Sequence, residues 1–109
     1  MTIEELQQFI SDQDAYFRAR RAGDFTPREH VFARTIKLGE EYGELCDEVL
    51  ASIDGQRAEK MNGREASHLE DEFADVLITT FMLAKAMDVD IMKALDHKVP
   101  KIRERNSKK

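Results

Sequence analysis

Carboxylates with a three-residue spacing occur twice in the sequence and are its first candidates for chemistry. Glu41 and Glu44 form one pair, and Glu72 and Asp75 form the other. Residues three apart share a face of a helix, and like charges placed there repel unless water or a cation screens them. The second pair lies in a segment, residues 69–87, that is apolar almost all the way round. Because carboxylates are rarely buried without a partner, the two pairs predict a site for a divalent cation.

The ligand type indicates which metal such a site would take. Carboxylate oxygens suit magnesium, with manganese also possible, better than zinc or copper. A di-iron bundle needs Glu-x-x-His pairs on two helices, and the chain has only one, from Glu65 to His68. We therefore interpret His30, His68 and His97 as ordinary surface or cap-region residues rather than ligands.

A group of basic residues near the C-terminus is the other candidate for binding. Lys98, Lys101 and Arg105 recur three and four residues apart, so they share one helix face. This pattern fits two interpretations. One is a solubilising tail whose positive charge is favourable at a helix C-terminus. The other is a surface that binds phosphate oxygens, which a carboxylate site alone would repel.

The elements that must position these groups are predicted to be helices. Thr2 with Glu5 reads as a capping box, and Thr26 followed by Pro27 is a second strong helix start. Asp90 is expected to cap the last helix. The predicted helices span residues 3–21, 27–53, 65–87 and 91–105, with a polar, mobile connector over 56–64. We expect an all-α, antiparallel four-helix bundle-like domain. The apolar arcs of the second and third helices are wide, which predicts a homo-oligomer.

Composition favours one helical domain over residues 1–109, with its core over 27–105 and a frayed tail at 106–109. The single cysteine, Cys46, excludes an internal disulfide framework and fits a reducing compartment. No apolar run approaches the roughly 20 residues of a membrane span, and no signal-peptide pattern is present, so we expect a cytoplasmic protein. The net charge is −5, and from residue 97 onward six Lys or Arg stand against one Glu, which leaves −10 for the rest. This acidic balance disfavours nucleic acid as a partner.

The order of the acidic motifs is similar to that of a known family. Glu-Glu-x-x-Glu at residues 40–44 followed by Glu-x-x-Asp at 72–75 resembles the MazG-like all-α nucleoside triphosphate pyrophosphohydrolases, as do Ala94-Leu95 and the basic residues after them. The resemblance covers roughly residues 27–105. It implies magnesium-dependent hydrolysis of a (deoxy)nucleoside triphosphate to the monophosphate and pyrophosphate, for house-cleaning or control of the nucleotide pool, by a homodimer or homotetramer. It also implies that Glu41, Glu44, Glu72 and Asp75 hold the metal and that Glu40 orients or deprotonates the attacking water.

The base-binding part of that pattern is where the sequence departs from the family. Related enzymes often place tryptophan near the nucleotide base, and this chain has none. Tyr16, Phe17 and Phe25 are the available aromatic substitutes, although core packing is the expected role of each. Two alternatives remain open. Phosphoribosyl-ATP pyrophosphohydrolases share the acidic pattern, and a non-catalytic helical module could retain the acids to bind divalent ions for an interaction.

Overall fold

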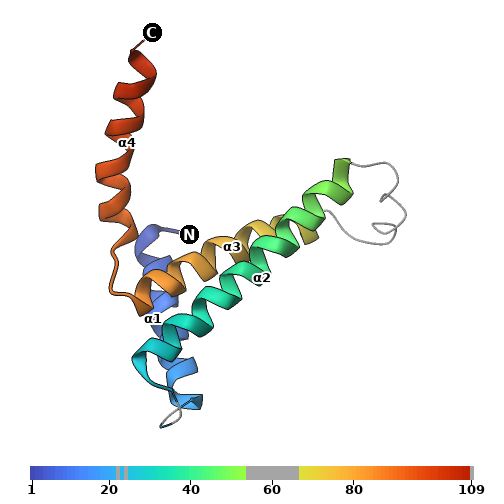
Figure 1. Cartoon of the computed structure of the whole chain (residues 1–109), viewed down its shortest axis with the longest axis vertical. Helices are drawn as coiled ribbons and strands as arrows, with labels where there is room; N and C mark the ends of the chain where they lie inside the picture. The colour runs from blue at the N-terminus through green and yellow to red at the C-terminus, as the bar shows by residue number, and fades with distance from the viewer. Residues whose placement is uncertain (22, 24, 54–66, 109) are drawn as a thin grey trace.

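A computed structural model describes residues 1–21, 23, 25–53 and 67–108. Their regular structure is helical throughout, which confirms the all-α prediction for this part of the chain. The helices are α1 (Ile3–Arg20), α2 (Pro27–Ile53), α3 (Ser67–Ala86) and α4 (Ile91–Ser107) (Figure 1). The predicted connector at 56–64 and the predicted start of the third helix at Glu65 lie outside the described residues. The last helix includes residues 106 and 107, which we expected to lie in a frayed tail.

Reciprocal capping boxes fix where the first two helices begin. Thr2 accepts a hydrogen bond from the Glu5 backbone N–H at 3.1 Å, and the Glu5 side chain accepts one from the Thr2 N–H at 3.0 Å. Thr26 and Glu29 make the same pair of bonds, at 3.1 and 3.2 Å. Each box satisfies two N–H groups that a helix start leaves without partners. The sequence predicted both.

The link between α3 and α4 is a tight turn with a defined direction. Val89 N–H donates to the Ala84 carbonyl at 2.8 Å and Asp88 N–H donates to Lys85 at 3.2 Å, the pair of bonds of a Schellman motif. Asp88 occupies the left-handed position with φ 57°, which aspartate tolerates better than most residues. Asp90 then caps α4 by accepting a hydrogen bond from the Lys93 N–H. The link therefore sets the direction in which α4 leaves α3.

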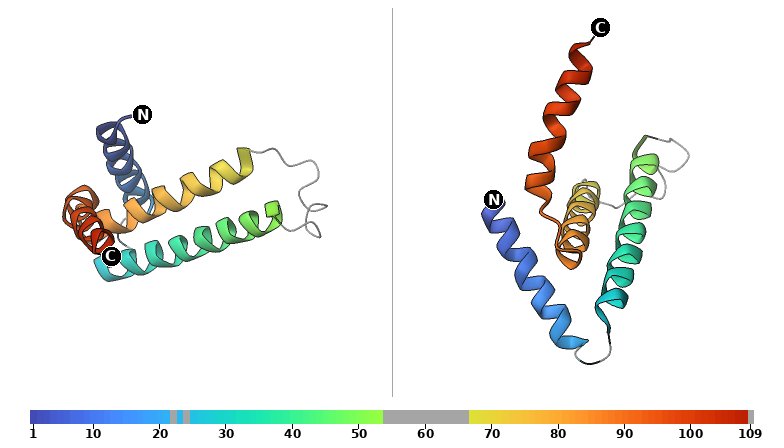
Figure 2. Two further views of the ribbon diagram at one scale, coloured as in Figure 1. Left: turned by 90° about the horizontal axis from the view of Figure 1, so that it is seen from above. Right: turned by 60° about the vertical axis from the view of Figure 1, so that its left-hand side comes forward.

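Within one chain, α2 and α3 form an antiparallel pair to which α1 and α4 are attached. α2 and α3 run side by side over most of their length, and α1 packs against α3 (Figure 1). α1 and α2 form the arms of a V, with α3 seen between them in the right-hand view of Figure 2. α4 extends away from these three helices and buries none of its residues. The all-α, four-helix part of the prediction is confirmed for the described residues, but the helices do not close into a bundle within one chain because the α3–α4 turn directs α4 outward.

The core of the single chain is small and partly polar. Among the described residues, the buried apolar ones are Ile10, Ala51 and Met82, and four polar or charged residues are also buried: Asp14, His30, Arg34 and Glu41. The accessible surface is 8351 Å², against roughly 6,200 Å² expected for a compact monomer of this mass. None of the described helices is long and apolar enough to span a membrane.

Candidate metal centre

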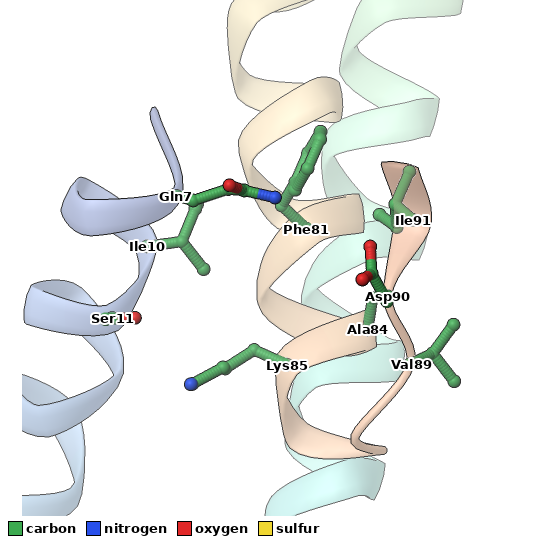
Figure 3. Close-up of a pocket in the computed structure, with 9 residues that line it drawn as sticks. All are labelled: Gln7, Ile10, Ser11, Phe81, Ala84, Lys85, Val89, Asp90 and Ile91. Carbon is green, nitrogen blue, oxygen red and sulfur yellow. The ribbon is translucent and has the colours of Figure 1, made fainter. Parts of the chain in front are cut away.

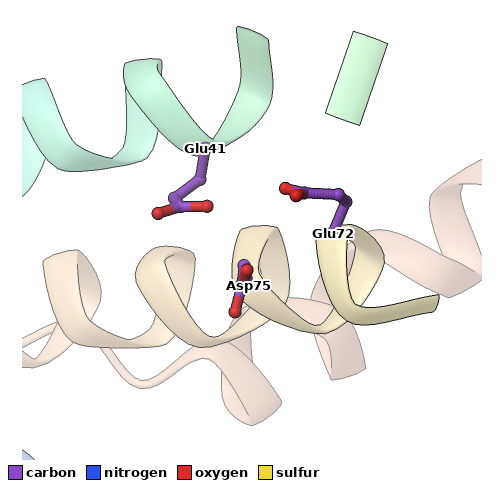
Figure 4. Close-up of side chains that lie close together, drawn as sticks. All are labelled: Glu41, Glu72 and Asp75. Carbon is purple, nitrogen blue, oxygen red and sulfur yellow. The ribbon is translucent and has the colours of Figure 1, made fainter. Parts of the chain in front are cut away.

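Three of the four carboxylates predicted to bind metal meet between α2 and α3. Glu41 points from α2 toward α3, and Glu72 and Asp75 come from neighbouring turns of α3 (Figure 4). One oxygen from each side chain lies within 4.8 Å of the others. The three-residue spacing puts Glu72 and Asp75 on one face of α3, and the antiparallel pairing of the two helices brings Glu41 opposite them.

The carboxylate group is sheltered from water and incompletely satisfied. Glu41 is only 7% exposed, and Glu72 and Asp75 are half-buried. The Oε2 atoms of Glu41 and Glu72 are buried and accept no hydrogen bond from any described residue. Ionised carboxylates are acceptors only, so a cation among them would satisfy these oxygens. An all-oxygen donor set fits a hard divalent cation such as Mg²⁺.

Burial and mutual repulsion both raise pKa values within the group. Burial raises the pKa of Glu72 above its usual value, and the charges of Glu44, Asp75 and Glu41 raise it further. Burial also raises the pKa of Asp75, with Glu41 as the largest charge contribution. Both shifts describe carboxylates that are costly to keep ionised together without a cation.

Glu44, the fourth predicted ligand, lies beside the group but outside the three-residue cluster. Its side chain is exposed, and the negative charge of Glu41 is the largest of the causes that raise its pKa. Asp75 contributes to the same shift, so Glu44 is electrostatically coupled to both helices. Glu48, half-buried one turn further along α2, raises the pKa of Glu72. The sequence signalled Glu48 through its place in the same row of α2, but it was not predicted as a ligand.

Glu40, predicted to act on water, lies at the edge of the group. Its side chain is 58% exposed and stands 3.7 Å from the amino group of Lys37. The same amino group is 3.1 Å from Glu41 Oε1, and the bond to Glu41 is the main cause that raises the pKa of Lys37. Lys37 was not predicted as a site residue, although its i,i+4 spacing from Glu41 is a recognisable signal.

The basic residues predicted to bind phosphate are not brought to the carboxylates within one chain. Lys98, Lys101 and Arg105 are exposed on α4, and α4 extends away from the α2–α3 pair (Figures 1 and 2). Of the candidate base-binding aromatics, Tyr16 and Phe17 lie on α1, and Phe25 lies just before the start of α2. Tyr16 and Phe25 are exposed, and Phe17 is half-buried.

His30, predicted to be a surface or cap-region residue, lies in the first turn of α2 and is buried there. It is only 3% exposed, and its Nε2 lies 3.2 Å from Asp14 Oδ1. The contact of the ring with Asp14 of α1 is a tertiary contact that local sequence does not reveal. His68 and His97 are exposed, as predicted.

Cavities also occur outside the carboxylate group, and two of them are relevant to binding. One, of about 230 Å³, separates α1 from the end of α3 and contains Ile10, Phe81, Lys85 and Asp90 in its wall (Figure 3). Asp90 is already engaged as the cap of α4. The other, of about 350 Å³, lies between α1 and α2 and extends as far as Lys37 and Glu40.

These features define an all-α domain with an acidic group suited to a divalent metal. The family model of the MazG nucleotide pyrophosphohydrolase domain matches residues 33–109, and the chain belongs to this family. The matched region begins within α2 and contains every predicted carboxylate and basic residue of the site. The resemblance inferred from the two acidic motifs is thus confirmed. No curated protein and no solved structure matched the chain.

Proposed function

We propose that this chain is a magnesium-dependent nucleoside triphosphate pyrophosphohydrolase, which converts a (deoxy)nucleoside triphosphate and water into the monophosphate and pyrophosphate. The observation that carries this proposal is the convergence of Glu41, Glu72 and Asp75 from two helices, with buried oxygens that lack partners. Family membership supplies the reaction class.

The metal would be held by Glu41, Glu72 and Asp75, with Glu44 completing the set. Glu44 is exposed, and its coupling to Glu41 and Asp75 supports this role. A bound Mg²⁺ supplies charge neutralisation at the phosphates and makes water a better nucleophile. The residues of the chain contribute a fixed arrangement of carboxylates, because both helices are held by their antiparallel packing.

Glu40 would act on the attacking water as a general base or an orienting acceptor. Its position next to Glu41 in the chain and its exposure allow it to contact water without joining the buried carboxylates. A base of this kind removes a proton from water as the water oxygen bonds to a phosphorus of the α–β linkage and the bridging P–O bond of that linkage breaks, which yields the monophosphate and pyrophosphate. Lys37, bonded to Glu41 and near Glu40, would limit their mutual repulsion.

The α4 residues Lys98, Lys101 and Arg105 would bind phosphate oxygens of a nucleotide held by a second copy of the chain. The exposed apolar side chains support this assembly, because large ones remain uncovered on α2, α3 and α4: Ile36, Tyr42, Leu50, Phe73, Leu77 and Leu95. The radius of gyration, 17.4 Å, exceeds the roughly 13 Å of a compact domain of this length. A homodimer or homotetramer would bury these faces.

Pyrophosphate release from a panel of nucleotides tests the function directly. The panel contains ribo- and deoxyribonucleoside triphosphates and phosphoribosyl-ATP, each with and without magnesium. We expect magnesium-dependent release from at least one triphosphate by the wild type and none by Glu72→Gln. Glu70→Gln is the matched control, because Glu70 is exposed on the same helix. Release from phosphoribosyl-ATP alone would favour the alternative enzyme, and no release from any nucleotide would favour a non-catalytic ion-binding module.

A further inference from the structure

A buried guanidinium group lies between α1 and α2, apart from the carboxylates. Arg34 is only 6% exposed, and its Nε and Nη2 donors reach no acceptor in the described part of the chain. Buried donors are nearly always satisfied, and a buried charge without a bonded partner is destabilising. The burial of Arg34 therefore calls for a ligand or for a partner group.

The nearest negative group does not fill this role. Asp14 stabilises the charge of Arg34 from a distance, but its oxygens are engaged by Arg18 Nε at 2.8 Å and His30 Nε2 at 3.2 Å. The guanidinium carbon of Arg34 instead lies 4.8 Å from the centre of the Phe17 ring. The Phe17 ring stacks against the flat face of the guanidinium, and the N–H donors at the edge of the guanidinium remain available for an acceptor.

Arg34 shares its cavity with two more cations. Arg21 and Lys37 line the same space of about 350 Å³, together with Phe17, Ile36 and Glu40. The Nη1 donor of Arg21 is likewise buried without an acceptor among the described residues. Lys37 contacts both Glu40 and Glu41, so one end of the cavity adjoins the carboxylate group. Three cations and one carboxylate give the cavity a positive balance.

We propose that Arg34, Arg21 and Lys37 form an anion subsite that binds phosphate oxygens of the substrate's polyphosphate chain. The inference rests on the proposed function for the identity of the ligand. A guanidinium presents parallel N–H donors that match two oxygens of one phosphate group. An anion there would satisfy the open donors of Arg34 and Arg21, and its next phosphate could extend past Lys37 toward Glu41.

Tripolyphosphate binding, measured by calorimetry on the full chain in EDTA at physiological ionic strength, tests the subsite without metal or hydrolysis. We expect Arg34→Met to weaken binding about 10- to 100-fold, the loss of one or two charged hydrogen bonds. Arg21→Met should weaken it similarly and provides a second variant if Arg34→Met does not fold. Arg28→Met is the matched control. Arg28 is exposed on α2 and also lies over an aromatic ring, Phe32 at 5.2 Å, but it does not line the cavity.

Thermal unfolding without ligand separates a binding role from a structural one. An anion-binding Arg34 is an unsatisfied buried cation in the free protein, so Arg34→Met should leave the Tm unchanged or raise it by about 4–8 °C. A structural Arg34, paired for example with a carboxylate of a second copy, would instead give a lower Tm on substitution.

Besides a lower Tm for Arg34→Met, two binding results would overturn the subsite. The first is wild-type tripolyphosphate affinity in the folded Arg34→Met and Arg21→Met variants. The second is an equal loss in Arg28→Met, which would mean that only the general charge of the surface matters. Failure of the proposed function is seen separately, as absence of pyrophosphate release from nucleotides by a wild type that still binds tripolyphosphate through Arg34.

Discussion

The amino group of Lys37 lies 3.1 Å from Glu41 Oε1, one turn away on α2, and it is the only cation bonded to the carboxylate group among the described residues. It also lines the cavity that contains Arg34. Lys37 therefore joins the acidic and the basic parts of the molecule. Its positive charge lowers the pKa of Asp75 and so offsets part of the effect of burial and of the Glu41 charge, which raise that pKa.

Replacing Lys37 should make the protein depend more on magnesium. In EDTA, Lys37→Gln should lower the Tm by about 1–5 °C, a modest effect because the side chain is half exposed to solvent. Without the competing charge of Lys37, the carboxylates should bind magnesium more tightly. Because tighter binding stabilises the folded state more, saturating magnesium should raise the Tm of this variant more than that of the wild type. Thermal scans with Lys93→Gln as the control provide the measurement. Equal magnesium-induced shifts in all three proteins would contradict the role of Lys37.

Glu40 should affect turnover more than metal binding. Glu40→Gln keeps the size of the side chain and removes the base, so we expect kcat to fall about 100-fold or more. The magnesium concentration needed for half-maximal activity should stay nearly unchanged, whereas Glu41→Gln should raise it. Steady-state kinetics over a magnesium titration measure both effects. Normal turnover by Glu40→Gln would assign the base elsewhere, with Glu44 as the next candidate.

Asp14 should contribute stability that disappears in acid. Burial raises its pKa, but the hydrogen bonds and charges of Arg18 and His30 outweigh that effect and lower the pKa below 3.8. A carboxyl group with a depressed folded pKa stabilises the protein above its unfolded pKa, and this contribution is lost as the pH falls through the folded pKa. Asp14→Asn should therefore lower the free energy of unfolding by about 1–3 kcal/mol at neutral pH, and much less once the pH has fallen through the folded pKa of Asp14.

Urea unfolding across this pH range measures the difference between the wild type and Asp14→Asn. The matched control is Asp12→Asn, because Asp12 is exposed on the same helix and accepts a hydrogen bond from Gln8. The control should change stability little at any pH. If the difference in free energy of unfolding between the wild type and Asp14→Asn does not shrink in acid, the ion pair is not the source of that difference.

The parts of the fold that depend on local sequence were predictable. The capping boxes at Thr2 and Thr26 and the cap at Asp90 gave three helix starts because each signal acts within one turn. The convergence of Glu72 and Asp75 with Glu41 was also predictable, since helix periodicity fixes which residues share a face. The buried pair of Asp14 and His30 depends on how α1 folds over α2, so no local pattern contained it.

The direction of α4 was not predictable for a related reason. Its amphipathic pattern indicated a helix with an apolar stripe, but not whether that stripe packs on the same chain or on another. The turn at Asp88 directs it away from α3. The same uncertainty applies to Arg34, because nothing in the local sequence of α2 indicated that its side chain would be buried beside a cavity. Tertiary geometry, rather than periodicity, decides both features.

Assembly should complete the site. Light scattering at micromolar concentration should give at least twice the chain mass of 12.6 kDa. If α4 acts on a neighbouring copy, mixing inactive Glu72→Gln and Lys98→Ala chains should restore part of the activity, because some mixed sites would contain neither substitution. Mixing each variant with itself is the control. A fully active monomer would contradict both the assembly and the shared site.

Direct titration of magnesium is the measurement that tests the account most closely, because the proposed function depends on the carboxylate group. Calorimetry should detect Mg²⁺ binding to the wild type and to Glu70→Gln, and a loss of affinity of about 10-fold or more in Glu72→Gln, which removes one charged ligand. Circular dichroism should show the same helix content in all three proteins. Absence of Mg²⁺ binding by the wild type, or equal affinity in folded Glu72→Gln, would contradict the assignment of Glu41, Glu72 and Asp75 as a metal site.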